Sequence, residues 1–128
     1  MADQFKTHYT RDEANALLPQ LRGWLDHLNE LRRNLEKYDK RIRGLMNDGG
    51  DLGGDAVNNW IRAVAATQEV LMEFQQREIM IKDLERGLLD FPAVIGGREV
   101  FLCWEKDEES VEYWHELDTG YAGRERIE

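Results

Sequence analysis

Apolar residues in the first third of the chain recur at alternating steps of four and three residues. The pattern follows Thr10, which precedes Glu13 by three residues, the spacing of a helix capping box. Such steps align apolar side chains on one stripe of a long α-helix, as in coiled coils. The sequence therefore predicts a helix over residues 10–46, bent at Pro19. Its apolar stripe consists of Leu17, Leu21, Trp24, Leu28, Leu31, Leu35, Tyr38, Ile42 and Leu45.

A second segment with the same period follows a glycine-rich break. Residues 47–54 include four glycines, which favours a loop. A phosphate-binding loop is disfavoured, because no strand precedes these glycines and no Gly-Lys-Ser/Thr follows them. After Asp55, which can cap a helix, the period predicts a second helix over residues 55–82. A short loop between two long helices predicts an antiparallel hairpin. The second stripe consists of Val57, Trp60, Val64, Thr67, Leu71 and Phe74.

Each predicted helix also carries apolar residues outside its stripe. Leu18 and Leu25 lie in the first half of one helix, and Met72 and Ile79 lie in the second half of the other. In an antiparallel hairpin these two halves are neighbours, at the open end where the rest of the chain emerges. We therefore expect the remaining chain to cover that end.

The rest of the chain is rich in the β-branched and aromatic residues that strands favour. Three such runs, Leu88–Ala93, Arg98–Trp104 and Ser110–His115, are separated by short turns. Connections of this length predict an antiparallel meander over residues 87–118. Pro92 is expected on an edge strand or at a bulge.

These elements define the predicted fold class as α+β. We expect a single domain over residues 1–128. A long antiparallel two-helix hairpin, coiled-coil-like in character, carries a small antiparallel β-sheet packed at its open end. Residues 119–128 are expected to form an irregular tail.

Strand register decides which side chains share a face of the sheet. A turn at residues 106–109 would pair Phe101 with Trp114. Because side chains alternate along a strand, His115 and Cys103 would then point to opposite faces. A shift of one residue would reverse this arrangement.

Composition and charge narrow the class of protein. The 128 residues include one cysteine, which excludes an internal disulfide, and no apolar run approaches the ~20 residues of a membrane span. The chain begins without the apolar core of a signal peptide, so a reducing cytoplasm is expected. Of the net charge of −9, residues 87–128 carry −7, whereas residues 1–54 have a net charge of 0. The acidic region should repel nucleic-acid phosphates and anionic lipid.

A basic face on the first predicted helix, formed by Arg33, Lys37 and Arg41, bears on the choice of partners. Nucleic-acid contact is disfavoured, because no aromatic platform accompanies the charges and the protein is acidic. A solvated face and a contact with the acidic region of a second copy both remain open.

The sequence lacks a complete catalytic motif, since HExxH, GxSxG and a paired CxxC do not occur. Asp90 interrupts an apolar strand and needs a partner if it is buried, which Arg98 or Arg124 could supply. Cys103 lies between Leu and Trp, as a buried inert thiol or as part of a ligand site. Catalytic residues stay unassigned. The candidate ligand-binding residues are Asp90, Arg98, Cys103 and Arg124.

His115 is the histidine that the sequence places nearest to other ligand-capable residues. With Glu116 and Asp90 it could hold a divalent metal ion, the one cofactor that the sequence suggests. Alternatively, it is a strand-end histidine hydrogen-bonded to the backbone, because a single His with nearby carboxylates is weak evidence for a metal site.

Two stretches match the pattern of a known family. TRDEANALLPQL at residues 10–21 matches an opening signature, Thr-x-Glu-Glu-Ala-Asn-x-Leu-Leu-Pro-x-Leu. Residues 82–126 match a C-terminal pattern that includes Asp-Phe-Pro-Ala, Leu-Cys-Trp, Trp-His-Glu and Gly-Phe-Ala-Gly-Arg. The chain thus resembles the bacterial family catalogued as domain of unknown function 2203, whose name implies no activity. The resemblance emphasises Asp90, Phe91, Pro92, Cys103, Trp104, Trp114, His115, Glu116, Gly123 and Arg124.

The chain departs from this family pattern at two places. Glu78 stands where members often have glycine, which leaves open both the end of the second helix and any strand at residues 79–82. Asp107 and Glu109 stand where members usually have glycine and proline, which affects the type of the last hairpin turn and hence the register.

The leading interpretation is a non-enzymatic interaction or assembly module. Two heptad stripes leave a second helical face uncovered, which favours a homodimer that forms a four-helix bundle, or another protein partner. The alternative is a small metal- or ligand-binding protein, or an enzyme, with a site around Asp90, His115 and Glu116.

Overall fold

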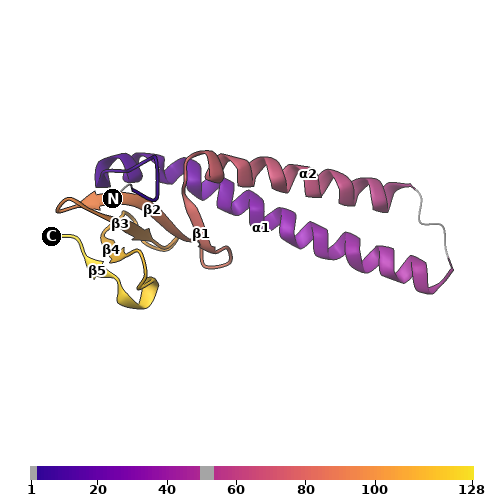
Figure 1. Ribbon diagram of the computed structural model, residues 1–128. Coiled ribbons are helices and arrows are strands. Elements are labelled where there is room, and N and C mark those ends of the chain that lie inside the picture. Colours follow the sequence, from indigo (N-terminus) through magenta and orange to yellow (C-terminus); the bar gives the residue numbers. More distant parts are fainter. Residues whose placement is uncertain (1–2, 50–53) are drawn as a thin grey trace.

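The computed structural model describes residues 3–49 and 54–128, which form a long helical hairpin joined to a sheet (Figure 1). This arrangement confirms the predicted α+β class. The predicted loop at 47–54 falls partly on residues 50–53, outside the described residues. The elements are α1 (Arg11–Asn47), α2 (Asp55–Gln76), β1 (Met80–Asp83), β2 (Leu88–Ile95), β3 (Arg98–Trp104), β4 (Tyr113–Glu116), the 3-10 helix η1 (Tyr121–Gly123) and β5 (Glu125–Arg126).

Helix α1 begins with the predicted capping box. The hydroxyl of Thr10 accepts a hydrogen bond from the Glu13 N–H at 3.1 Å, and the Glu13 carboxylate accepts one from the Thr10 N–H at 2.9 Å. The two bonds satisfy amide groups that a helix start leaves without partners. The helix then continues for 37 residues, through Pro19.

The α2 face that packs on α1 differs by one residue from the predicted stripe at three positions. Leu71 is 36% exposed, whereas Val70 is buried. Ala56 and Ala63 are likewise buried, in place of their neighbours Val57 and Val64, which are half-buried. Small residues at a seven-residue interval let two helix backbones approach closely, and this close approach decides which stripe is used.

The sheet covers the open end of the hairpin, as predicted (Figure 1). Leu18 and Leu25 of α1 are buried in one core with Phe91 and Trp104 of the sheet. Their position outside the α1 stripe therefore reflects contact with the sheet. The same expectation is wrong for Met72, which is 51% exposed on α2.

Helix α2 ends at Gln76, not at residue 82, and a strand that the helix prediction missed follows it. The chain reverses at Glu78, whose φ of 58° lies in the left-handed region that usually requires glycine. The Glu78 carboxylate accepts hydrogen bonds from the N–H groups of Lys6 and Thr7, at 2.9 and 2.7 Å. These two bonds to the N-terminal segment help to offset the strain of a non-glycine residue there.

The strands form one antiparallel sheet in the order β1-β2-β3-β4-β5. Strand β1 pairs with β2 only as far as Asp90, so Pro92 lies where that side of β2 has no strand neighbour, and the Pro92 carbonyl accepts a hydrogen bond from the Tyr9 N–H at 2.7 Å. The expected edge strand is therefore wrong, since β2 is an interior strand, but the proline lies where one side of that strand is open. The predicted tail is partly regular, since it supplies η1 and β5.

The register between β3 and β4 is shifted by one residue from the prediction. Phe101 pairs with His115, and Leu102 pairs with Trp114. The cause is the connection after Trp104, where Val111 is fully buried and is tied to α1: its N–H donates to the Asn15 side chain, and its carbonyl accepts from Arg11. The longer connection reverses the predicted faces and places His115 on the same face as Cys103.

Candidate functional site

Three polar side chains from three neighbouring strands meet inside the sheet layer. Asp90 of β2 pairs in register with Cys103 of β3, and His115 of β4 lies on the same face of the sheet. The opposite face, with Leu89 and Leu102, packs in the helix-side core. All three polar side chains are at most 2% exposed. A carboxylate oxygen, the thiol sulfur and a ring nitrogen lie within 4.8 Å of one another, and we call this group the Asp–Cys–His cluster.

The hydrogen bonds of His115 fix how many protons the pair with Asp90 holds. Nδ1 lies 2.7 Å from the Glu116 carbonyl oxygen, which can only accept, so Nδ1 carries a hydrogen. Nε2 lies 2.9 Å from Asp90 Oδ1, and one further proton between these two atoms satisfies both. The pair therefore carries no net charge, which is the arrangement that burial tolerates best.

The thiol of Cys103 is neutral in this structure. Burial, and secondarily the nearby charge of Asp90, raises its pKa to about 12, against the opposing effect of the nearby Arg124 guanidinium. A thiol with such a pKa is a poor nucleophile near neutral pH, because nucleophilic attack needs the thiolate. The geometry therefore favours binding or packing at Cys103 over covalent catalysis.

The structure separates two of the other predicted site residues, Glu116 and Arg98, from the cluster. The carboxylate of Glu116 pairs with Arg98 near the surface, where both side chains are substantially exposed. Of the predicted metal ligands His115, Glu116 and Asp90, the Glu116 carboxylate is thus directed elsewhere, and its backbone carbonyl serves His115 instead. Arg124 approaches Cys103 and pairs with Glu108 rather than with Asp90.

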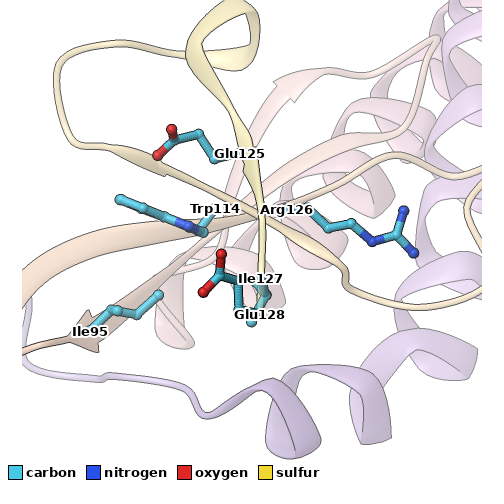
Figure 2. A pocket seen from close by; sticks show the side chains of 6 residues that line it. All are labelled: Ile95, Trp114, Glu125, Arg126, Ile127 and Glu128. Atoms are coloured by element: carbon cyan, nitrogen blue, oxygen red, sulfur yellow. The ribbon is translucent and has the colours of Figure 1, made fainter.

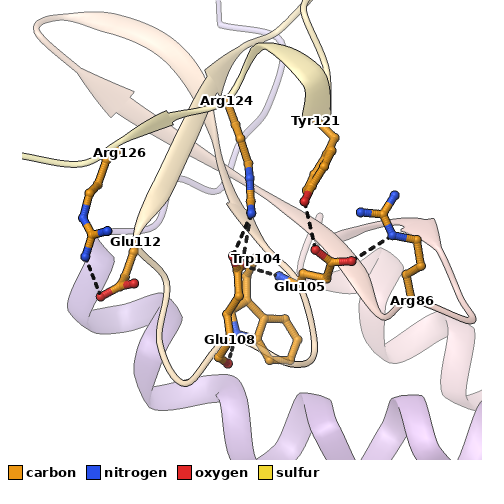
Figure 3. A network of polar contacts seen from close by, with 8 residues as sticks. All are labelled: Arg86, Trp104, Glu105, Glu108, Glu112, Tyr121, Arg124 and Arg126. Carbon is orange, nitrogen blue, oxygen red and sulfur yellow. Dashed lines mark hydrogen bonds and ion pairs between the residues drawn. The ribbon is translucent and has the colours of Figure 1, made fainter.

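Sequence reasoning missed a stack of arginine and tyrosine side chains, of which Figure 3 shows Arg86, Tyr121 and Arg124. The guanidinium of Arg124 lies 3.9 Å from the ring centre of Tyr113 and 4.3 Å from that of Tyr121. The guanidinium of Arg86 lies 4.5 Å from the ring centre of Tyr121. Glu108 accepts two hydrogen bonds from Arg124, at 3.1 and 2.8 Å. No local pattern signals this stack, because its members meet only after the chain turns between β3, β4 and η1, and Arg86 comes from the turn before β2.

Ion pairs occupy several acids of the acidic C-terminal region. Four of its acids pair with arginines: Glu105 with Arg86, Glu108 with Arg124, Glu112 with Arg126, and Glu116 with Arg98. Of these arginines only Arg86 lies outside residues 87–128, and the other three are already counted in the net charge of −7. The charge difference between the two ends of the chain therefore persists, although these carboxylates are engaged within one copy.

A second candidate surface is an apolar stripe on α2 that points away from α1. We define the α2 stripe as Val57, Ile61, Val64, Leu71 and Met72. Ile61 is 53% exposed and Met72 is 51% exposed. At its sheet end the stripe meets a mostly apolar groove of about 410 Å³. The apolar side chains that line this groove are Phe5, Leu71, Phe74, Ile79, Met80 and Ile81.

A larger open pocket, of about 810 Å³, lies at the far end of the sheet (Figure 2). Trp114, Ile95 and Ile127 give it an apolar side, and the charged side chains of residues 125, 126 and 128 line the rest. Trp114 neighbours His115 in β4, so the two side chains point to opposite faces of the sheet. Trp114, which lines this pocket, is therefore on the opposite face of the sheet from the Asp–Cys–His cluster.

Together these features define an α+β protein in which a two-helix arm extends from a small antiparallel sheet with a buried polar cluster. The family described as an uncharacterised conserved protein, domain of unknown function 2203, matches residues 7–127, and the chain belongs to this family. The match confirms the resemblance seen in the sequence. No curated protein and no solved structure matches the chain. Among the described residues, no helix combines the length and apolar character that crossing a bilayer requires.

Proposed function

We propose that this protein is an assembly module that forms a homodimer through the α2 stripe. The observation that carries the proposal is the division of apolar residues on α2. The small residues Ala56 and Ala63 face α1, whereas the larger Ile61 and Met72 are about half exposed. A monomer would leave these larger side chains in water, although burying such side chains is the main source of stability in helical packing.

The spacing of the α2 stripe suits a helix of the same kind. Val57, Ile61, Val64 and Leu71 follow the heptad steps that two packed helices share. A coiled-coil-like contact on this face would turn two hairpins into a four-helix bundle. The proposal thus gives the long arm, which extends away from the sheet in Figure 1, a role in association.

Charge complementarity favours a second copy of this chain as the occupant. A two-fold axis near Ala66 sets Ile61 of one copy against the Leu71 end of the other in antiparallel orientation. The same axis brings the exposed Arg62 of each copy toward the exposed Glu69 of the other. Two opposite-charge contacts then border an uncharged stripe, so one surface complements itself.

The test is the mass of the full chain in solution, measured by sedimentation or light scattering over a range of micromolar concentrations. We expect twice the chain mass of 15.0 kDa for the wild type. The double variant Ile61→Glu/Met72→Glu should give the single-chain mass with an unchanged helical circular dichroism signal. Charges placed in an apolar contact oppose association strongly.

The matched control is Ala16→Glu/His27→Glu. These two exposed positions on α1 have the same spacing of eleven residues, and the substitutions also add two carboxylates. The control should keep the mass of the wild type. A wild type of 15.0 kDa throughout the range, or a control that dissociates equally, would overturn the homodimer.

A further inference from the structure

We propose that Asp90, Cys103 and His115 together bind one divalent transition-metal ion of the zinc type. Each residue contributes one ligand atom from a different strand, and the three atoms lie within 4.8 Å of one another. Ligand atoms on a tetrahedral zinc ion are separated by about 3.5 Å, which follows from bond lengths of about 2.0–2.3 Å. Small side-chain rotations within a fixed sheet are enough to reach this spacing.

The combination of ligands selects the class of metal. A thiolate and an imidazole are ligands of zinc and its neighbours, and a carboxylate is a common addition. Calcium and magnesium prefer oxygen ligands throughout, so a set with one sulfur and one nitrogen disfavours them. The cluster supplies three ligand side chains, and a water molecule would be the fourth ligand of a tetrahedral ion.

His115 is already oriented as a metal ligand. Its Nδ1–H donates to the Glu116 carbonyl at 2.7 Å, which directs Nε2 toward Asp90 and Cys103. Metal-binding histidines generally donate their second ring N–H to a backbone or side-chain oxygen in this way. The ring also lies against Phe101, with the two centres 5.5 Å apart, and this contact restricts its rotation.

The exchange of protons for a metal ion leaves the buried charge unchanged. Without metal, Asp90 and His115 share one proton between Nε2 and Oδ1, and Cys103 keeps its thiol proton. On binding, bonds form from the metal to sulfur, oxygen and Nε2, and the two protons leave to water. The charges of a divalent ion, one thiolate, one carboxylate and a neutral imidazole sum to zero. Burial therefore costs little additional charge desolvation in the loaded state.

Arg124 fits this scheme despite its positive charge. Its proximity opposes part of the rise in the pKa of the Cys103 thiol, and two hydrogen bonds to Glu108 balance its charge. An N–H donor to a metal-bound thiolate is a common feature around such sites. The guanidinium therefore supports the thiolate ligand, while its own charge is paired outside the cluster.

The experiment titrates the metal-free full-length protein with Co²⁺, a spectroscopic substitute for zinc, under reducing conditions. We expect one equivalent to produce a near-ultraviolet sulfur-to-cobalt band together with the intense visible bands of tetrahedral cobalt. Zinc should abolish both signals by displacement. Asp90→Asn should weaken the apparent affinity by about 100-fold or more, since loss of an outer contact alone costs 10–100-fold.

Three further variants separate this cluster from other carboxylates and histidines. Cys103→Ser should remove the sulfur band, and its circular dichroism spectrum shows whether it has folded. Glu116→Gln, which changes a carboxylate that pairs with Arg98, should keep the full cobalt spectrum. His8→Gln should also keep it, because His8 belongs to a separate surface group with Asp3 and Glu99.

A cobalt titration of the wild type without a sulfur band would overturn the proposal. So would a Glu116→Gln variant that loses the band together with a Cys103→Ser variant that retains it. None of the substituted residues belongs to the α2 stripe, so the outcome is independent of whether the protein is a homodimer.

Discussion

Nε2 of His115 lies 2.9 Å from Oδ1 of Asp90, and both side chains are 2% exposed. Because the pair shares one proton, each residue gives the other the hydrogen-bond partner that a buried polar group needs. Either residue left alone would be an unsatisfied polar group, or a charge, in a closed part of the sheet. The relationship joins β4 to β2 across β3, and so ties three strands together.

We predict that Asp90→Ala destabilises the protein far more than Asp90→Asn. Removal of one member of a buried pair costs about 3–5 kcal/mol, because its partner stays buried without compensation. The Asn amide can still donate to a neutral His115 ring, so we expect a cost of about 1–2 kcal/mol. Urea unfolding followed by circular dichroism measures both values. Equal costs for the two variants would contradict the shared-proton arrangement.

The sequence predicted the hairpin and the meander because each depends on a local signal. The capping box at Thr10 and the long helix that follows it rest on local signals, and both are confirmed. The predicted stripe of α1 is only partly right, because Leu18 and Leu25 are buried where Leu17 and Trp24 were expected. The register of β4 is not local, since it depends on how Val111 is held by Asn15 and Arg11, about a hundred residues earlier. A shift of one residue there decides whether His115 faces Cys103.

The candidate site shows the same limit. Asp90, Cys103 and His115 were each recognisable as ligand-capable residues in strands, but their meeting required the correct register. Glu116 was grouped with His115 because the two are adjacent in sequence. Adjacent residues of a strand point to opposite faces, so the Glu116 side chain could not follow the imidazole.

The division of α2 into two faces leads to a second prediction. Ala63→Leu should destabilise the hairpin by about 1–3 kcal/mol, because the helices meet closely at this position and the larger side chain overfills the contact. The control, Ala16→Leu, lies on the exposed face of α1 and should change stability by less than about 0.5 kcal/mol. Thermal or urea unfolding of the two variants provides the comparison. If Ala63→Leu is as mild as its control, Ala63 does not lie in the helix contact.

Cys103 gives a prediction about alkaline pH. Burial, with the charge of Asp90, raises the pKa of its thiol to about 12 in the folded protein. A thiol in the unfolded chain ionises near pH 8.5. The stability that depends on the neutral thiol is therefore complete below pH 8.5 and is lost as the pH rises toward 12, by up to about 1.4 kcal/mol per pH unit.

The check compares the pH dependence of urea unfolding for the metal-free wild type and metal-free Cys103→Ala between pH 8 and 11. All other groups are the same in both proteins, so the difference between their free energies of unfolding at each pH reports on Cys103. We expect the difference to narrow as the pH rises, and native Cys103 to resist alkylation that proceeds readily after unfolding. Parallel curves would contradict the raised pKa.

Glu99 holds the N-terminal segment against the sheet, which leads to a prediction at acid pH. Its carboxylate accepts hydrogen bonds from the N–H groups of Gln4 and Phe5, at 2.8 and 3.0 Å, and lies 2.7 Å from His8 Nε2. Burial raises the pKa of Glu99, but the hydrogen bonds from His8, Gln4 and Phe5 lower it by more. The resulting pKa is therefore below the ordinary value of 4.5.

A lowered pKa in the folded state means that the attachment is complete above pH 4.5 and is lost as the pH falls through the folded value. Phe5 packs against Phe101 with ring centres 5.3 Å apart, so release of the segment also uncovers that ring. The protection factors of the Gln4 and Phe5 amides, which correct their exchange rates for the intrinsic slowing toward acid pH, should therefore fall at acid pH. In Glu99→Gln the same amides should exchange rapidly at neutral pH, whereas the exposed Glu109→Gln should leave them protected. Protection that survives in Glu99→Gln would show that other contacts, such as those to Glu78, hold the segment without it.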